Sequence, residues 1–229
     1  MTELAGKHIL VTGASGGLGS LIARALIAAG ATVSLAGRDE ARLTQVSPES
    51  PRYTVDLSAP GAGTALLAAA AATPLDGIVL AHGAVAFGAA GDLPNAVARL
   101  LTAINLDSVI EIIGAAPAYL ADSAAASRDP FILTISGIIA DMPTIGMSAY
   151  GAGKAGLKAY VTAASRELRR SGIRLLDARP GHTMTELSLH PLAGTAPAMA
   201  AGLDPESVAT RIVQAIVNDE KDVPADSFS

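Results

Sequence analysis

The stretch TGASGGLG, residues 12–19, decides the fold, because it joins a strand-sized apolar run, His8–Thr12, to a helical pattern, Leu18–Ala29. Glycines permit a tight turn and let the backbone approach a pyrophosphate, and the following helix offers free N–H groups and a positive dipole end. An ordinary glycine-rich turn is the alternative, but placement at a first strand-to-helix turn favours dinucleotide binding. The residues expected at the phosphates are Gly13, Ser15, Gly16, Gly17, Leu18 and Gly19.

Short apolar runs alternate with helical patterns along the rest of the chain. Further strands are expected at Ala31–Ala36, Arg52–Val55, Gly77–Ala81, Phe131–Ile135 and Ile173–Ala178. Helices are expected from Arg38 (with Asp39 as N-cap) and over Gly61–Ala72, Leu93–Leu120, Ser148–Arg170 and Pro205–Val217. This alternation is typical of βαβ units and a parallel sheet covered on both faces. The prediction is one doubly wound, Rossmann-type α/β domain over residues 1–229, with six or seven strands.

Composition excludes several other classes of protein. The chain is 50% hydrophobic, has a net charge of −5 and contains no cysteine. Such apolar content excludes disorder, and the lack of cysteine excludes disulfides and cysteine-based zinc sites. The four histidines do not show metal-ligand spacing, so no metal is expected. An acidic chain without a signal-peptide pattern or a bilayer-length apolar stretch is expected to be cytoplasmic, with no nucleic-acid or membrane partner.

The end of the second predicted strand bears on which dinucleotide binds. An acid there normally holds the ribose 2′-hydroxyl of NAD, whereas a cation accommodates the 2′-phosphate of NADP. The strand ends in Gly37-Arg38, and the planar guanidinium of Arg38 can pair with a phosphate, to which Ser15 could add a hydroxyl. Asp39 could instead hold a ribose, although its position suits a helix cap. The sequence therefore favours NADP over NAD.

Tyr150 and Lys154 are four residues apart in a predicted helix and so share one face. A cation beside a phenol favours the phenolate, which makes a tyrosine usable as a general acid or base near neutral pH. Taken alone this spacing usually marks a surface pair. Its position after the fifth strand of a nucleotide-binding sheet indicates a catalytic pair instead.

With these features in order, the chain resembles the short-chain dehydrogenase/reductase family over nearly its whole length. Asp56-Leu57 after the third strand, Asn105 in the long fourth helix, and Pro180-Gly181 followed by Thr185 add to the glycine loop and the Tyr150/Lys154 pair. The resemblance implies that Tyr150 exchanges a proton with a carbonyl or alcohol oxygen while a hydride passes to or from a small or medium substrate. Lys154 would bind the nicotinamide ribose and tune Tyr150, and Asn105 would hold a water in a proton relay.

The resemblance also implies where further residues meet the cofactor. Asp56 and Leu57 would lie at the adenine, and the segment from Pro180 to Thr185 would reach the nicotinamide carboxamide. The implied cofactor residues beyond the glycine loop are Arg38, Asp56, Leu57, Ala81, His82, Gly83, Tyr150, Lys154, Pro180, Gly181, Thr183 and Thr185.

Three features depart from the family pattern. The serine that family members usually carry thirteen residues before the tyrosine is Gly137 here, and neighbouring Ser136 can replace its hydroxyl only if the backbone bends at Gly137. Leu80-Ala81-His82-Gly83 stands where the family usually shows Asn-Asn-Ala-Gly. The usual last strand ending in Asp-Gly-Gly is absent, although Val223–Phe228 could add an edge strand limited by Pro224.

Two regions are expected to make contacts beyond the cofactor. Residues 184–204 form the expected substrate loop. His82 and His182 are expected to be ordinary polar loop residues, and His182, at the expected mouth of the pocket, is the better functional candidate of the two. Family resemblance implies a homodimer or homotetramer through the fourth and fifth helices. The apolar side chains expected to leave an assembly surface there are Leu100, Ile104, Ile112 and Ile113.

Two hypotheses follow. The first is an NADP-dependent oxidoreductase acting on a carbonyl/alcohol pair, with Tyr150 as general acid/base, Lys154 and Asn105 beside it, and Ser136 as a candidate for the missing hydroxyl. The second is an NADP-binding protein with little or no catalysis, acting as a sensor or partner module, because of Gly137 and the altered Leu80–Gly83 loop.

Overall fold

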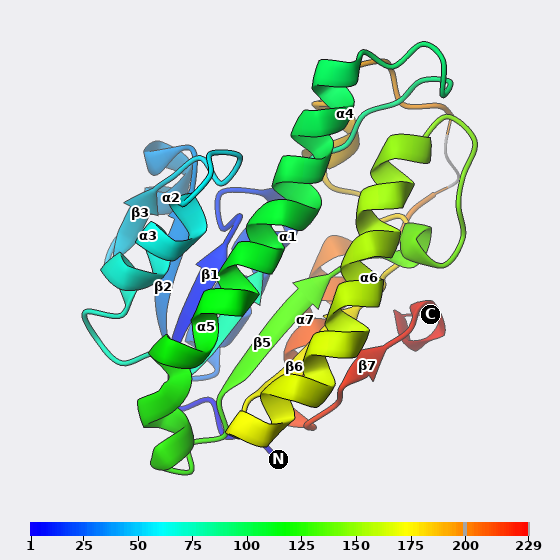
Figure 1. Ribbon diagram of the computed structural model, residues 1–229. Coiled ribbons are helices and arrows are strands. Elements are labelled where there is room, and N and C mark those ends of the chain that lie inside the picture. The colour runs from blue at the N-terminus through cyan, green and yellow to red at the C-terminus, as the bar shows by residue number, and fades with distance from the viewer. Residues whose placement is uncertain (199–200, 229) are drawn as a thin grey trace.

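The computed structural model describes residues 1–198 and 201–228, which form one seven-stranded parallel sheet in the order β3-β2-β1-β4-β5-β6-β7 (Figure 1). The strands are β1 (His8–Thr12), β2 (Thr32–Gly37), β3 (Arg52–Thr54), β4 (Gly77–Leu80), β5 (Phe131–Ile135), β6 (Arg174–Ala178) and β7 (Asp222–Val223). The strand order reverses between β1 and β4, as in doubly wound folds, whose ligands bind at the carboxyl ends of the strands beside that point. The predicted fold class is confirmed.

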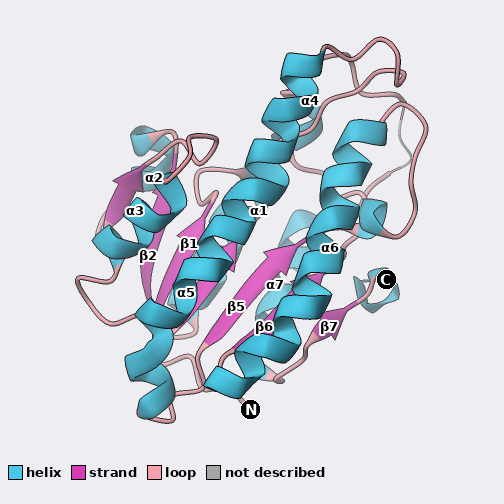
Figure 2. Ribbon diagram, viewed as in Figure 1, coloured by secondary structure: helices cyan, strands magenta, loops and turns pink. Residues whose placement is uncertain are grey.

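Helices cover both faces of the sheet (Figure 2). They are α1 (Gly17–Ala28), α2 (Glu40–Val46), α3 (Ala62–Ala70), α4 (Asn95–Thr102), α5 (Ser108–Ala125), α6 (Ser148–Leu168) and α7 (Pro205–Val217). One face carries α1 and α7, and the other carries α3, α5 and α6. Asp39 and Asp204 cap α2 and α7 by accepting the N–H of Arg42 and Ser207, as the sequence predicts for helix starts. No helix in the described part of the chain is long and apolar enough to cross a membrane.

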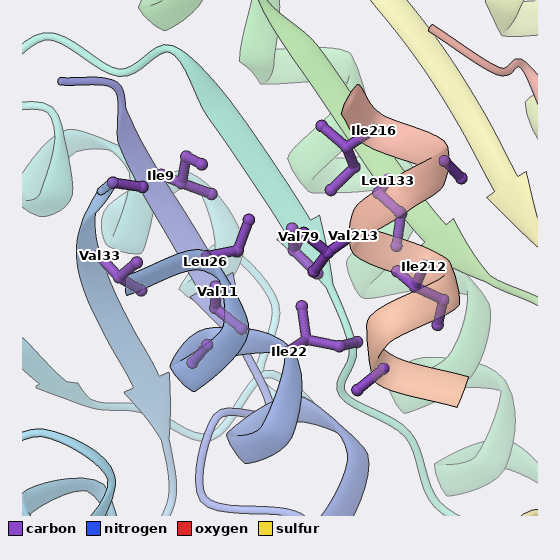
Figure 3. Close-up of a cluster of buried hydrophobic side chains, with 14 of the residues drawn as sticks. Ile9, Val11, Ile22, Leu26, Val33, Val79, Leu133, Ile212, Val213 and Ile216 are labelled. Carbon is purple, nitrogen blue, oxygen red and sulfur yellow. The ribbon is translucent and has the colours of Figure 1, made fainter. Parts of the chain in front are cut away.

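Each face of the sheet has its own apolar core. Figure 3 shows the core under α1 and α7, where Ile22, Leu26 and Ile212 pack on the β1, β4 and β5 side chains. The opposite core lies under α3, α5 and α6 and contains Ile112 and Ile113, both buried. The expectation that these two isoleucines leave an assembly surface is therefore wrong, because the sheet itself covers them.

The long predicted helix over 93–120 is interrupted. A π-helical turn, Ala103–Asp107, separates α4 from α5, and α5 continues to Ala125. The interruption places Asn105 in the wide turn, where the regular helical ladder is broken. Periodicity of apolar residues does not reveal such a turn, because the apolar spacing continues on both sides of it.

The C-terminal segment is a strand for two residues only. Asp222 and Val223 pair with β6 in parallel, and Ala225–Phe228 then form a 3₁₀ turn. The expected edge strand over Val223–Phe228 is thus present only at its first residue, since Pro224 ends the ladder as anticipated. Arg179 secures this edge through a bidentate contact with Asp222, at 2.5 and 2.9 Å.

Asp76, just before β4, joins four elements at the amino end of the sheet. Its carboxylate accepts hydrogen bonds from the His8 backbone N–H, the Ser123 hydroxyl and two guanidinium nitrogens of Arg128, at 2.6–2.9 Å. Burial works against the charged form, but these donors outweigh it and lower the pKa of Asp76 to about 2. The Asp76 carboxylate therefore stabilises the folded state at the end of the sheet that lies away from the glycine loop.

We expect Asp76→Asn to lower the free energy of unfolding at pH 7 by about 2 kcal/mol, since the folded pKa lies about two units below the ordinary value. Because the folded pKa is depressed, this stabilisation is present above about pH 4 and is lost as the pH falls towards 2. Urea unfolding at several pH values measures it, with Asp122→Asn on the exposed face of α5 as control. A difference between wild type and D76N that stays constant from pH 7 to pH 3 would contradict the assignment.

Candidate active site

A cavity of about 510 Å³ opens at the carboxyl ends of the strands and contains all the predicted cofactor residues in its lining. They come from the β1–α1 loop, the ends of β2 and β3, the β4 loop, the first turns of α6, and the segment after β6. Ser136 also lines it, whereas Asn105 lies behind the wall. Segments far apart in the sequence thus meet at one place because all seven strands run in the same direction.

The glycine loop is shaped for close backbone approach. Gly13 has φ +68°, and a Cβ on it would lie 2.6 Å from the backbone of His82. A Cβ on Gly19 would lie 2.2 Å from the Gly13 carbonyl oxygen, so α1 starts directly against the turn. No side chain caps the N-terminus of α1, and its first turn carries no acid. The free N–H groups and the positive helix end are therefore available to an anion, which is what a pyrophosphate requires.

The carboxyl end of β2 brings together a hydroxyl and a cation. The Ser15 side chain packs on Gly37, where an added Cβ would lie 2.5 Å from Ser15 Oγ. Arg38 follows, exposed and in the cavity lining. Across from it, hydrogen bonds from Ser58 lower the pKa of Asp56, with a smaller contribution from the charge of Arg38. Asp39 is occupied as the cap of α2, so the cavity wall at this point presents Arg38 rather than an acid.

Tyr150 and Lys154 occupy the first turns of α6. Lys154 Nζ lies 6.0 Å from the Tyr150 ring centre and donates a 2.7 Å hydrogen bond to the Ile135 carbonyl at the end of β5. Burial raises the pKa of Tyr150 to about 12, because the phenolate loses water. Burial lowers the pKa of Lys154 to about 8, although the charge of Asp177 acts in the opposite direction. At neutral pH Tyr150 is therefore a protonated phenol beside a predominantly charged ammonium group.

Asn105 holds the loop that follows β4. Its Nδ2 donates to the Ala84 and Leu101 carbonyls at 2.9 and 3.0 Å, and its Oδ1 accepts the Ala84 N–H at 3.2 Å. A Cβ on Gly83 would lie 3.0 Å from this Oδ1 and 3.8 Å from Lys154 Nζ. The Asn105 amide and the Lys154 ammonium group therefore both lie close to Gly83. Both amide protons are used, which leaves one lone pair of Oδ1 for a further donor such as water.

His82 has a role that the sequence does not reveal. Its ring lies between Thr12 Oγ1, 2.6 Å from Nδ1, and Ser108 Oγ, 2.9 Å from Nε2. Burial, with a smaller effect of the Lys154 charge, lowers the pKa of His82 to about 3. The imidazole is therefore neutral and ties the end of β1 to α5. Its two polar partners are distant in sequence, so no local pattern predicts the contact.

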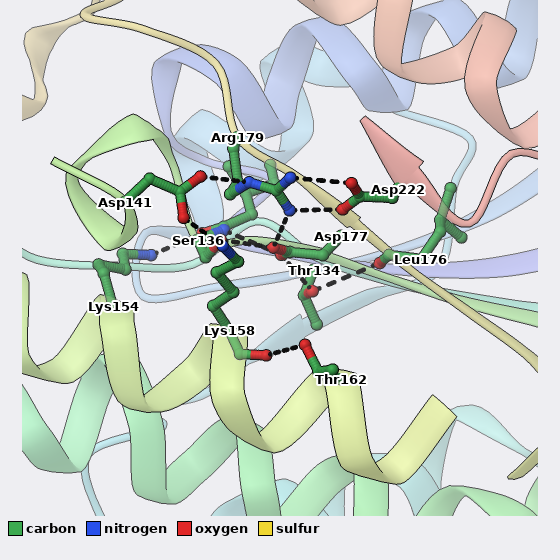
Figure 4. A network of polar contacts seen from close by, with 11 residues as sticks. Thr134, Ser136, Asp141, Lys154, Lys158, Thr162, Leu176, Asp177, Arg179 and Asp222 are labelled. Carbon is green, nitrogen blue, oxygen red and sulfur yellow. Dashed lines mark hydrogen bonds and ion pairs between the residues drawn. The ribbon is translucent and has the colours of Figure 1, made fainter. Parts of the chain in front are cut away.

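Ser136 donates its hydroxyl proton to a carboxylate behind the site (Figure 4). Ser136 Oγ lies 2.5 Å from Asp177 Oδ2, and Asp177 also accepts from the Ser136 N–H and from Thr134 Oγ1. Burial raises the pKa of Asp177 in spite of these donors. A serine hydroxyl has one proton, so in this arrangement Ser136 has none left to polarise a substrate carbonyl.

The backbone bends at Gly137, in a conformation that side chains avoid. Gly137 has φ +75° and ψ 163°, a region that is essentially restricted to glycine. Its N–H donates to the Ala178 carbonyl and that of Ile138 to the Pro180 carbonyl, so the bend is tied to the segment after β6. The bend turns the chain after Ser136 but leaves the Ser136 hydroxyl on Asp177.

We expect Gly137→Ser to lower the free energy of unfolding by about 1–3 kcal/mol, because any Cβ there imposes backbone strain. Gly137→Ala carries the same backbone cost without the hydroxyl and is the matched comparison. Urea unfolding of the two variants measures it. A serine variant as stable as the natural chain would show that the bend is not fixed by its neighbours.

The predicted substrate loop, 184–204, is anchored at several points. Residues 199–200 of this range lie outside the described residues. Thr183 bridges to Leu203, and Arg42 Nη2 lies 2.7 Å from Glu186 Oε2, an ion pair that joins α2 to this segment. His182 and His190 both line the cavity.

Three backbone hydrogen bonds close one end of the cavity. Leu192 N–H donates to the Val85 carbonyl, Phe87 N–H to the Ala193 carbonyl, and Gly88 N–H to the Gly146 carbonyl, at 2.8–2.9 Å. The loops that follow β4, β5 and β6 are thus joined into one wall. The sequence places these segments at the same sheet edge but gives no sign of the bonds between them.

A doubly wound sheet with a glycine loop at its first turn and a Tyr/Lys pair at its cavity defines a nucleotide-binding protein of the dehydrogenase class. The chain belongs to the short-chain dehydrogenase/reductase family, since the sequence model described as short chain dehydrogenase matches residues 7–191.

Individual relatives agree with this membership. The chain is 32% identical to 2,3-dihydro-2,3-dihydroxybenzoate dehydrogenase of Escherichia coli over 81% of this chain and 73% of that protein. It is 29% identical to a dehydrogenase/reductase SDR family protein 7-like of Anopheles gambiae over 96% and 75%. Among solved structures, a metagenomic short-chain oxidoreductase in complex with NADP has a TM-score of 0.79 and 28% identity, covering 98% of each chain.

Proposed function

We propose that this protein is an NADP-dependent oxidoreductase that interconverts a small or medium carbonyl compound and its alcohol, with Tyr150 as general acid/base. The observation that carries the proposal is the Tyr150 phenol in the cavity wall with the Lys154 ammonium group 6.0 Å from its ring centre. The uncapped N-terminus of α1 and the close-packed glycine turn fit a pyrophosphate, and Arg38 with Ser15 fits the 2′-phosphate that NADP carries.

When bound, NADP(H) supplies or accepts the hydride. In the reduction direction Tyr150 donates its phenolic proton to the carbonyl oxygen, and in the reverse direction it takes the alcohol proton. Since the phenol is protonated at neutral pH, the reduction direction has its proton donor ready. Lys154 would bind the nicotinamide ribose and stabilise the phenolate left after the transfer. Asn105 holds the Ala84 loop and has one lone pair for a relay water.

The titration that tests the proposal combines two measurements on purified protein. NADPH binding is followed by calorimetry, and NADPH oxidation by its absorbance against a panel of ketones and aldehydes. We expect micromolar binding and measurable turnover with at least one carbonyl compound. Failure of NADPH to bind would overturn the proposal.

A second candidate function is cofactor binding with little catalysis, as in a sensor or partner module. The observation that favours it is that no free serine hydroxyl stands at the usual position, since residue 137 is glycine and the Ser136 hydroxyl is bonded to Asp177. Removing one positioned donor at such a site typically costs about 10²–10³ in rate. Tight NADPH binding without turnover against the whole panel would select this candidate over the first.

A further inference from the structure

The cavity has two chemically different ends. The ends of β1, β2 and β3 contribute the glycine loop, Arg38, Arg42 and Asp56, and so carry charge suited to a nucleotide. The loops after β4, β5 and β6 contribute polar side chains such as Thr144, His182 and His190, together with a group of apolar side chains around the first turn of α6, where Tyr150 stands. The apolar side chains are Val85, Phe87, Ile139, Met147, Leu187 and Leu192.

This second end, called the apolar end below, is a built wall and not a loose surface. Val85 and Phe87 are buried, and their backbone groups are bonded to Leu192 and Ala193. Gly194, at φ +72°, lies so close to Phe87 that an added Cβ would overlap the Phe87 carbonyl oxygen. The backbone of the wall is thus closely packed, and a charged group pressed against its apolar side chains would lose water without a partner.

The charged side chains in the cavity lining are already assigned elsewhere. Arg38, Arg42 and Asp56 lie at the nucleotide end, and Glu186 is paired with Arg42. Lys154 donates to the Ile135 carbonyl beneath Tyr150. In the proposed function Lys154 also holds the nicotinamide ribose. Among the described lining residues, the apolar end has no lysine or arginine besides Lys154 that could pair with a substrate carboxylate or phosphate.

Exposed apolar side chains also occur in the segments that line this end. Met142 and Ile145 are exposed in the loop that carries Met147, and Met184 and Leu189 are exposed in the segment that carries Leu187. Exposed large apolar side chains are a common mark of a binding site where they adjoin a cavity.

We infer that the substrate is a neutral, predominantly apolar ketone or aldehyde, or the corresponding alcohol, with no carboxylate or phosphate. The inference rests on the proposed function and specifies the substrate class of that site. It separates this chain from its Escherichia coli relative, whose name specifies a benzoate, a substrate that bears a carboxylate.

Three ketones of matched length test the inference: 2-octanone, 7-oxooctanoate and methyl 7-oxooctanoate. Each is offered with NADPH at pH 8 in the same buffer. We expect kcat/KM for 2-octanone and for the methyl ester to exceed that for the carboxylate by at least about 100-fold, because the carboxylate alone loses water without gaining a partner. A carboxylate reduced as efficiently as its ester would overturn the inference.

A charge placed on the wall should change this selectivity. Leu187 is partly exposed and lines the cavity, so a longer polar side chain can be accommodated there. We expect Leu187→Arg to raise the carboxylate-to-ester ratio of kcat/KM at least about 10-fold, and Leu187→Gln, of similar polarity without charge, to leave the ratio within about 2-fold.

The inference and the proposed function fail in different ways. If NADPH binds but none of the three ketones is reduced, the dissociation constants of the ketones from NADPH-saturated protein are compared instead of kcat/KM. We then expect 2-octanone and the methyl ester to bind more tightly than the carboxylate. Preferential binding of the carboxylate, or binding of none of the three, overturns the substrate class and leaves cofactor binding intact. Absence of NADPH binding itself overturns the proposed function.

Discussion

Tyr150→Phe is expected to lower kcat/KM for carbonyl reduction by about 10³-fold while leaving the protein folded and able to bind NADPH. The change removes one oxygen atom from a side chain that lines the cavity. With the usual serine position occupied by Gly137 and the Ser136 proton held by Asp177, Tyr150 is the proton donor that the proposed mechanism uses. The loss should therefore fall within the roughly 10²–10⁴-fold range that a general acid supplies. Steady-state kinetics with the best ketone of the panel measures it.

Tyr160→Phe is the matched control. It makes the same chemical change on the same helix, where Tyr160 packs beside the core under α6 and lies outside the cavity lining. We expect its kcat/KM to stay within about 2-fold of the natural value. A Tyr150→Phe variant that retains most of its turnover would show that another group supplies the proton. An unchanged NADPH dissociation constant in both variants separates chemistry from binding.

Arg38→Ala is expected to weaken NADPH binding about 10- to 100-fold and to change NADH binding by no more than about 2-fold. A hydrogen bond between a guanidinium and a phosphate contributes about 1.5–3 kcal/mol, and NADH has no 2′-phosphate to receive it. Calorimetric titration of both cofactors measures the two dissociation constants. Raising the salt concentration should reduce the difference, because Arg38 is exposed.

Asp39→Ala tests the alternative in which an acid holds the ribose of NAD. Asp39 Oδ1 accepts the Arg42 N–H at the start of α2, so its removal should lower the free energy of unfolding by about 1 kcal/mol. NADH binding should then stay within about 2-fold. Equal losses of NADH and NADPH in Arg38→Ala, or a selective loss of NADH in Asp39→Ala, would contradict the preference for NADP.

The sequence predicts most of the strands and helices because these elements follow from local patterns of residues. Strand-sized apolar runs and helical spacing identify β5 and α7 to the residue, and the glycine loop identifies the nucleotide end. Parallel strands then place Arg38, Tyr150 and Pro180 at one edge, although each comes from a different part of the chain.

What the sequence does not predict depends on pairings between distant residues. The partner of Ser136 follows from the β5–β6 register, which brings Thr134 opposite Asp177. The contacts of His82 follow from β1 and α5 meeting over the β4 loop. The π turn at Asn105 is not predicted because the apolar residues on both sides of it keep a helical spacing. The burial of Ile112 depends on the packing of α3 against α5.

The bend at Gly137 makes the loss of the serine difficult to reverse in evolution. A single nucleotide change can turn a glycine codon into a serine codon, but the new side chain would stand on a backbone that only glycine adopts. The bonds to Ala178 and Pro180 would have to break first, and those bonds belong to the segment after β6, which lines the cavity. Descendants of this chain are thus held to a site without that hydroxyl, and the walls around Tyr150 remain the part that selection can alter one residue at a time.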